Sequence, residues 1–158
     1  MRRLAPVLIV LLMFVACGGD TPDEVEPSAD PQLVVDQDRA AQSDLRNALA
    51  AAKVYWTDDD TYSGFDSGCT TAANTCANAE AIEPGIDWRS EPSQGESIVG
   101  VTLASLEEVV LTSISLSGEE FCIADKVSGG GGTVRGKGSG AASVATHAAC
   151  EALGPEAW

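Results

Sequence analysis

The chain has 158 residues, of which 44% are hydrophobic, and its nine basic and 24 acidic side chains give a formal net charge of −15. A chain of this length forms about one domain with a modest hydrophobic core. The acidic balance argues against a nucleic-acid partner, because phosphate recognition needs a basic stripe, and the few aromatic side chains argue against stacking on single strands.

The first 16 residues have the pattern of an export signal. Arg2 and Arg3 precede an uncharged, mostly apolar run over residues 4–16. As a helix this run would span about 20 Å, which is short for a hydrocarbon core of about 30 Å. We therefore expect residues 1–16 to be a signal peptide rather than a membrane anchor.

The end of this run resembles a bacterial lipoprotein signal, in which small residues precede a cysteine that is acylated and becomes the new N-terminus. Ala16 directly precedes Cys17, and Phe14 stands where such signals usually have leucine. The resemblance implies a lipid on Cys17 and an extracytoplasmic protein attached to a bacterial membrane. The alternative is an ordinary secretory signal with a cysteine beside its cleavage site.

Four further cysteines remain once Cys17 is assigned to the lipid: Cys69, Cys76, Cys122 and Cys150. An even number in an oxidising compartment is typical of a disulfide framework. Two disulfides are therefore expected, and four cysteines allow three pairings.

Residues 17–37 are expected to be an acidic, disordered tether. Gly18 to Asp38 contains seven acidic residues, three prolines and no basic residue. This stretch has little apolar surface to bury, and its like charges keep the chain extended. The folded domain is therefore expected to span residues 38–158.

A helical period follows the tether. Apolar residues recur at i, i+4, i+7, i+8 and i+11, while most polar side chains fall elsewhere on the helical wheel. The pattern predicts an amphipathic helix from Asp38 to Thr57, with Asp36 or Asp38 as its cap. Its apolar face comprises Ala41, Leu45, Ala48, Leu49, Ala52, Tyr55 and Trp56.

The rest of the chain predicts a small sheet. Residues 64–95 are punctuated by glycine and proline and are expected to be irregular, with one short strand at 86–89. Alternating apolar residues predict strands at 99–103 and 110–116, followed by a third at 121–127. Short connections favour an antiparallel meander, so the predicted fold class is α+β, with one helix packed on that meander.

The segment from Asp44 to Phe65 resembles the globular half of type IV pilins and pseudopilins. In that family a long helix ends at an aromatic pair, here Tyr55-Trp56, and a polar turn leads into a tyrosine-containing segment, here Thr61 to Phe65. Residues 81–86 and 120–125 continue the resemblance, which covers about residues 36–150.

The resemblance carries implications for fold, disulfides and partners. It implies that the helix packs across an antiparallel sheet. It also pairs Cys69 with Cys76 and Cys122 with Cys150. The implied partner is a pilus or a secretion pseudopilus.

The chain departs from that family at its N-terminus. Pilins assemble through a long apolar helix that runs into the amphipathic one and carries a glutamate near its start, and no such motif is present here. We therefore expect a pilin head on a lipid anchor rather than a filament subunit. A minor pseudopilin that retains residues 1–16 is the alternative, which acylation of Cys17 would exclude.

Two motifs near the C-terminus suggest ligands. Residues 131–137 match the first seven positions of a phosphate-binding loop, but Gly138 stands where a hydroxyl must bind magnesium. Residues 129–140, with seven glycines, are instead expected to be a flexible loop, and no nucleotide is expected. His147 and Cys150 form an i, i+3 pair, but zinc requires at least three protein ligands, so His147 is interpreted as a surface or loop residue.

Acidic and aromatic clusters lie around the predicted helix end. Asp58, Asp59 and Asp60, with Asp66, offer carboxylates to calcium, but their spacing does not match an EF-hand loop, and a helix-ending turn is favoured. The aromatic residues around the helix end are expected to lie in the core, and an exposed docking patch is the alternative. These aromatic residues are Tyr55, Trp56, Tyr62, Phe65 and Trp88, and Trp158 at the end of the chain is a further candidate for exposure.

The sequence thus favours a non-enzymatic, lipid-anchored cell-envelope protein that displays a disulfide-stapled, pilin-like domain. With a single imidazole and no nucleophile-elbow motif, no catalytic residue, metal or cofactor is assigned. A small-ligand-binding or hydrolytic envelope lipoprotein is the alternative class, and it would need a polar pocket.

Overall fold

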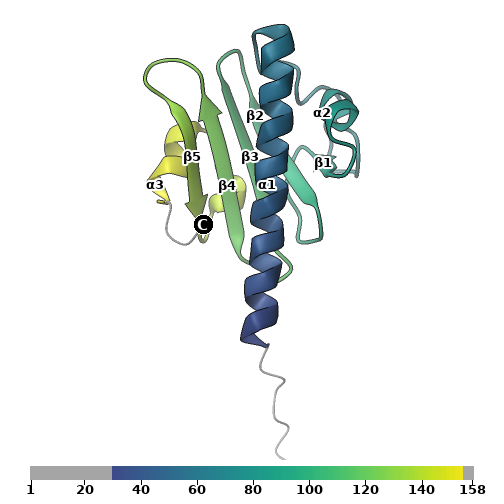
Figure 1. The fold of residues 1–158 in the computed structure, drawn as a ribbon, viewed down its shortest axis with the longest axis vertical. Helices are drawn as coiled ribbons and strands as arrows, with labels where there is room; N and C mark the ends of the chain where they lie inside the picture. The colour runs from purple at the N-terminus through teal and green to yellow at the C-terminus, as the bar shows by residue number, and fades with distance from the viewer. Residues whose placement is uncertain (1–29, 155–158) are drawn as a thin grey trace, which may run out of the picture.

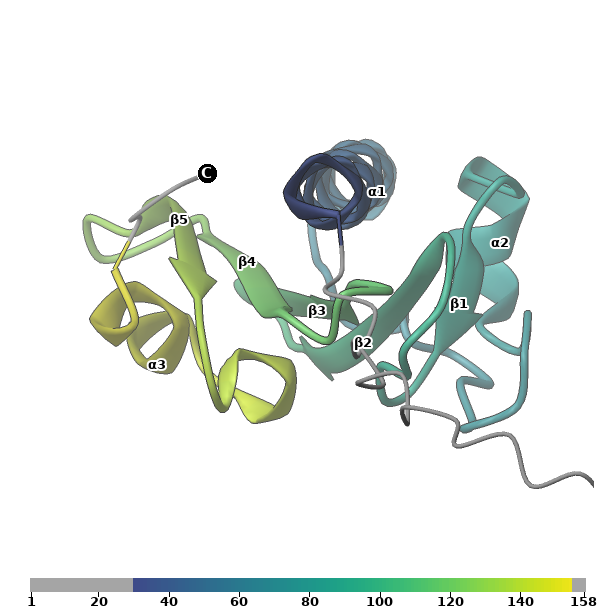
Figure 2. The same ribbon diagram turned by 90° about the horizontal axis from the view of Figure 1, so that it is seen from below.

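The computed structural model describes residues 30–154. Helix α1 (Pro31–Asp59) lies across one face of a five-stranded sheet, so the expected α+β class is confirmed (Figures 1 and 2). The other elements are α2 (Ala77–Ile82), β1 (Asp87–Arg89), β2 (Ile98–Ala104), β3 (Glu108–Ile114), β4 (Glu120–Lys126), β5 (Gly132–Lys137), the 3₁₀ turn η1 (Ala141–Ser143) and α3 (His147–Ala152). The expected signal peptide, the lipid site Cys17 and the terminal Trp158 lie outside the described residues.

Helix α1 begins seven residues before the predicted start at Asp38, so residues 31–37 of the predicted tether are helical. The carboxylate of Asp30 accepts a hydrogen bond from the Gln32 amide at 2.9 Å. Pro31 occupies the first helical position, where its missing N–H removes no helical bond. The acidic residues that suggested an extended chain therefore include the cap of the helix.

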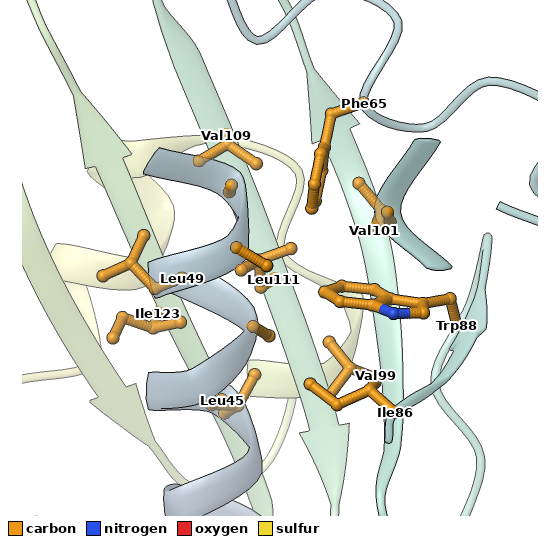
Figure 3. Packing of buried hydrophobic residues seen from close by; sticks show 14 of the residues in the cluster. Leu45, Leu49, Phe65, Ile86, Trp88, Val99, Val101, Val109, Leu111 and Ile123 are labelled. Carbon is orange, nitrogen blue, oxygen red and sulfur yellow. The ribbon is translucent and has the colours of Figure 1, made fainter. Parts of the chain in front are cut away.

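The inward face of α1 is the one that the periodicity predicts. Ala41, Leu45, Ala48, Leu49 and Ala52 are all buried. Alanine at three of these positions lets the helix backbone approach the sheet, while the two leucines fill the space between (Figure 3). The sheet side of this core comprises Val99, Val101, Val109, Leu111, Phe121 and Ile123.

The strand order is β1-β2-β3-β4-β5, and β2 to β5 pair as an antiparallel meander. The prediction of a purely antiparallel sheet is wrong at β1, which pairs with β2 in parallel. A three-residue strand rises only about 10 Å, a distance that residues 90–97 can retrace without a helical crossover. The returning chain passes close to β2, because a Cβ on Gly100 would lie 2.5 Å from the Pro92 nitrogen.

The glycine-rich segment predicted to be a flexible loop instead contains strand β5, which pairs with β4 from Phe121↔Lys137 to Lys126↔Gly132. Helix α3 and η1 cover this end of the sheet on the face opposite α1 (Figure 2). At Gly136 a Cβ would lie 2.6 Å from the Cys150 carbonyl oxygen and 2.8 Å from the Cys122 sulfur. A glycine there makes room for the overlying helix rather than giving flexibility.

We expect Gly136→Ala to lower the free energy of unfolding by about 1–3 kcal/mol, because the new methyl group overpacks the contact between β5 and α3. Urea unfolding followed by circular dichroism measures this change. Gly85→Ala is the matched control, since its Cβ would meet only the end of the flexible Glu83 side chain. Equal stability of the two variants would contradict this role for Gly136.

Candidate functional site

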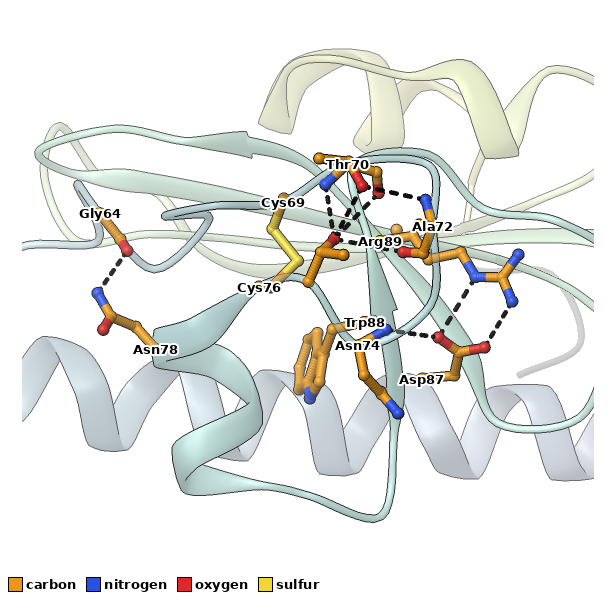
Figure 4. Close-up of a disulfide and its surroundings, with 12 residues drawn as sticks. Gly64, Cys69, Thr70, Ala72, Asn74, Cys76, Asn78, Asp87, Trp88 and Arg89 are labelled. Carbon is orange, nitrogen blue, oxygen red and sulfur yellow. Dashed lines mark hydrogen bonds and ion pairs between the residues drawn. A yellow bond between two sulfur atoms is a disulfide. The ribbon is translucent and has the colours of Figure 1, made fainter.

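The Cys69–Cys76 disulfide closes a seven-residue separation in the loop before α2, a segment that was predicted to be irregular (Figure 4). This loop covers the outer edge of β1, because the Ser90 amide donates to the Thr70 carbonyl at 2.8 Å. Asp87 of β1 also accepts a bond from the Asn74 amide at 3.1 Å. The disulfide therefore holds a segment that protects an otherwise open sheet edge.

The Cys122–Cys150 disulfide joins the middle of β4 to α3 across a sequence separation of 28. Both half-cystines are fully buried beside Val110, Ala124 and Ala141, in a second apolar cluster on the face opposite α1. The structure therefore contains two disulfides, in the pairing that the resemblance implies.

Three of the five aromatic residues around the helix end lie in the core, as expected. Tyr62, Phe65 and Trp88 are buried, and the Phe65 and Trp88 rings meet edge to face with centroids 5.4 Å apart. The Trp88 indole donates to the Glu83 carbonyl at 2.8 Å. Tyr55 and Trp56 pack partly buried against this cluster.

A polar cluster, Lys53–Tyr62–Asp125–Thr133, joins the end of α1 to strands β4 and β5 at the margin of the core. Tyr62 and Asp125 are buried, whereas Lys53 and Thr133 are exposed. The Tyr62 hydroxyl donates to one Asp125 oxygen at 2.7 Å, and the Thr133 hydroxyl donates to the other at 2.5 Å. Lys53 reaches that second oxygen at 2.9 Å. Asp125 is only 4% exposed, yet three donors satisfy its carboxylate.

The cluster shifts the pKa of two of its members. Burial works to raise the pKa of Asp125, but the hydrogen bonds from Thr133, Tyr62 and Lys53 together with the Lys53 charge outweigh it, and the pKa is lowered. Burial, followed by the hydrogen bond to the Asp125 carboxylate and its charge, raises the pKa of Tyr62. The cluster thus holds an ionised Asp125 carboxylate hydrogen-bonded to a neutral Tyr62 phenol, and this pair supports the fold.

Sequence reasoning did not single out this cluster, although a signal was present. Phe121, Ile123 and Asp125 alternate along β4, and the first two face the core beneath α1. Asp125 continues the same face, so the period places a carboxylate at a core position. A buried acid requires partners, which predicts a donor nearby.

His147 is not the surface or loop residue that the sequence predicted. It begins α3, is 8% exposed, and its Nε2 lies 2.9 Å from the Gly132 carbonyl oxygen. Its backbone amide donates to Glu108, and the Thr146 hydroxyl caps the helix through the Ala149 amide. The imidazole therefore fixes α3 against the start of β5, while its neighbour Cys150 is in a disulfide.

The two other segments that suggested a ligand form a strand and a helix end. Residues 131–137 lie largely in strand β5, with no helix opening after them as a phosphate-binding loop requires. Asp58 and Asp59 end α1, and Asp60 follows in a left-handed conformation with its amide donating to the Trp56 carbonyl. Within residues 30–154, no three His, Cys, Asp or Glu side chains are grouped closely enough to hold a metal ion.

A groove of about 390 Å³ lies beside the N-terminal half of α1. We call it the α1 groove. It is lined by Asp36, Gln37, Ala40, Ala41 and Asp44 from the helix, by Gly95, Glu96 and Ser97 before β2, and by Ser115 and Leu116 after β3. It is open at the surface.

The groove wall is fixed by contacts between α1 and the turn after β3. Asp38 accepts hydrogen bonds from Ser115 at 2.9 Å and Ser117 at 2.6 Å, and its other oxygen lies 3.4 Å from Lys137. Burial raises the pKa of the groove residue Asp44, although hydrogen bonds from Ser97 oppose the shift.

None of the helices within residues 30–154 is long and apolar enough to cross a bilayer. Comparisons of the chain with protein-family models, with curated proteins and with solved structures give no match.

Proposed function

We propose that this protein is a non-enzymatic, lipid-anchored component of a bacterial cell envelope that displays a disulfide-stapled, pilin-like domain. In this proposal Cys17 carries the lipid and residues 18–30 connect it to α1. The two disulfides suit an oxidising, extracytoplasmic compartment. A pilus or a secretion pseudopilus is the proposed partner.

The observation that carries the proposal is the start of α1. The helix extends past the sheet at one pole of the domain (Figure 1) and begins at Pro31, directly after the capping residue Asp30. A chain anchored upstream would enter at this pole, so the sheet and its loops would face away from the membrane. Because a cap and a proline are typical of a helix start, they favour a separate tether over one continuous pilin helix.

The polar cluster supports a non-enzymatic role. Its two groups with shifted pKa values, Tyr62 and Asp125, bond each other in the core, and both are almost fully buried. A catalytic group must contact substrate, whereas these side chains contact only parts of the fold. Their shifted pKa values are explained by burial and by contacts within the fold rather than by a catalytic role.

We expect Cys17→Ser to abolish the incorporation of labelled fatty acid into the protein, because the serine variant cannot carry a thioether-linked lipid. Metabolic labelling with palmitate, followed by immunoprecipitation, measures the incorporation. The Cys69→Ser/Cys76→Ser double variant is the control and should be labelled like wild type. Equal labelling of Cys17→Ser and wild type would contradict lipid attachment at Cys17, and a wild-type chain that carries no label and retains residues 1–16 would favour the pseudopilin alternative.

A further inference from the structure

The α1 groove combines apolar side chains with three carboxylates. Ala40 and Ala41 contribute small apolar side chains from α1, and Leu116, 41% exposed, borders them from the turn after β3. Leu33, 54% exposed, lies outside the groove lining, one helical turn before the groove residue Gln37. A segment bound along the groove would therefore meet one leucine within it and a second beyond its end.

Three carboxylates line the same groove, and none of its lining residues is cationic. Asp36 has Arg39 at 3.5 Å, an exposed pair that neutralises it only in part. Asp44 lines the groove from α1 and Glu96 from the segment before β2, with Ser97 as the hydrogen-bond partner of Asp44. Lys137 lies outside the groove lining and pairs with Asp38 and Glu119.

We infer that the α1 groove is a docking site for a segment of a partner protein that carries lysine or arginine beside large apolar side chains. The apolar side chains would cover Leu33, Leu116 and the alanines, and the cations would pair with the carboxylates of Asp44 and Glu96. A volume of about 390 Å³ lies within the range of about 300–1,000 Å³ typical of binding sites.

Charge selects this occupant over two others. A second copy of the chain carries the same formal −15 and would bring carboxylates against carboxylates. An anionic lipid surface would be repelled for the same reason. A cationic segment gains from every acidic side chain around the groove, and its approach is accelerated by the net charge of the domain.

The inference deepens the proposed function and rests on it only in assuming that a partner exists. It is tested with the full-length protein in nanodiscs of uncharged lipid and a fluorescent six-residue peptide of alternating leucine and lysine. Fluorescence anisotropy reports binding, with empty nanodiscs as the blank. Leucine–glutamate and serine–lysine peptides are the matched probes that lack the cations or the apolar side chains.

We expect the leucine–lysine peptide to bind most tightly, and Asp44→Asn/Glu96→Gln to weaken this binding about five- to tenfold. Leu116→Ser is expected to weaken it about threefold. Asp58→Asn/Glu91→Gln and Leu106→Ser are the controls, since they change the same charge or apolar surface outside the groove. Raising the ionic strength should weaken wild-type binding more than binding to Asp44→Asn/Glu96→Gln, which keeps the test informative if that variant alters the loop.

Four results would overturn the docking site. Equal weakening by the groove and control variants would show attraction to net charge alone, and equal binding of the three peptides would show no selectivity. Displacement of the peptide by micromolar calcium would identify a metal site instead. Dimerisation that the groove variants abolish would identify a second copy as the occupant. Each of these results leaves the expected loss of fatty-acid label from the Cys17→Ser variant, and hence the proposed anchor, untouched.

Discussion

Replacing Cys122 and Cys150 together by alanine is expected to lower the free energy of unfolding by about 3.5 kcal/mol. A bridge across a separation of 28 residues removes chain entropy from the unfolded state, and the loop-closure relation gives about this magnitude at 25 °C. Both sulfurs are buried against the second apolar cluster, so the alanine variant also loses packing beneath α3. Urea unfolding monitored by circular dichroism measures the loss.

The second disulfide provides the matched control. Cys69→Ala/Cys76→Ala opens a separation of only seven residues, for which the same relation gives about 2.5 kcal/mol. Amide hydrogen exchange should separate the two variants by location. The first should lose protection in α3 and β5, and the second in the loop that covers β1. A larger loss of unfolding free energy for Cys69→Ala/Cys76→Ala would contradict the larger stabilisation expected from the Cys122–Cys150 disulfide.

Asp125→Asn is expected to lower the free energy of unfolding by about 3 kcal/mol at neutral pH. The substitution removes the carboxylate that binds Lys53 and the Tyr62 and Thr133 hydroxyls, and it leaves buried polar groups poorly matched. Thr133→Val removes one of the three donors and should cost less. Equal losses for the two variants would show that the carboxylate is not the centre of the cluster.

The same cluster predicts how stability depends on acid. Because folding lowers the pKa of Asp125 from its ordinary value of 3.8, its stabilisation is complete above that value and is lost as pH falls through the folded pKa. Wild type should therefore lose stability below about pH 4 more steeply than Asp125→Asn. A stability difference that stays constant down to about pH 2 would contradict the assignment.

At alkaline pH the stability contributed by Tyr62 changes in the opposite direction, because it is lost as pH rises. Folding raises the pKa of Tyr62 above its ordinary value of 10.0, so its contribution is complete below that value and is lost as pH rises toward the folded pKa. Tyr62→Phe should remove this alkaline loss of stability. Absorbance at the tyrosinate band measures the titration directly, and one of the two tyrosines in wild type should ionise late.

Periodicity predicts the parts of this fold that depend on one buried face. The inward residues of α1 recur at helical spacing, so their burial follows from Ala41 to Ala52 without knowledge of the sheet. Helix α1 starts before both predicted caps, Asp36 and Asp38, because acidic residues such as Asp30 favour an extended chain when only their charge is considered. Asp30 followed by Pro31 is itself a helix-start signal, and local capping outweighs the charge of the segment.

The remaining differences arise from contacts distant in sequence. The glycines of β5 suggest flexibility until Cys150 and α3 are placed over Gly136. Parallel pairing of β1 depends on the path of residues 90–97, which short-range patterns do not encode. His147 of α3 is buried because it contacts Gly132 of β5 and Glu108 of β3. Each of these features needs the tertiary fold, which overrides local propensity.

Intact mass spectrometry of the protein extracted from its native membrane tests whether Cys17 anchors the displayed domain. We expect a chain that starts at Cys17, carries acyl groups, and gains about four daltons on reduction as two disulfides take up two hydrogens each. A chain that retains residues 1–16, or one that starts at Cys17 without lipid, would contradict the lipid anchor.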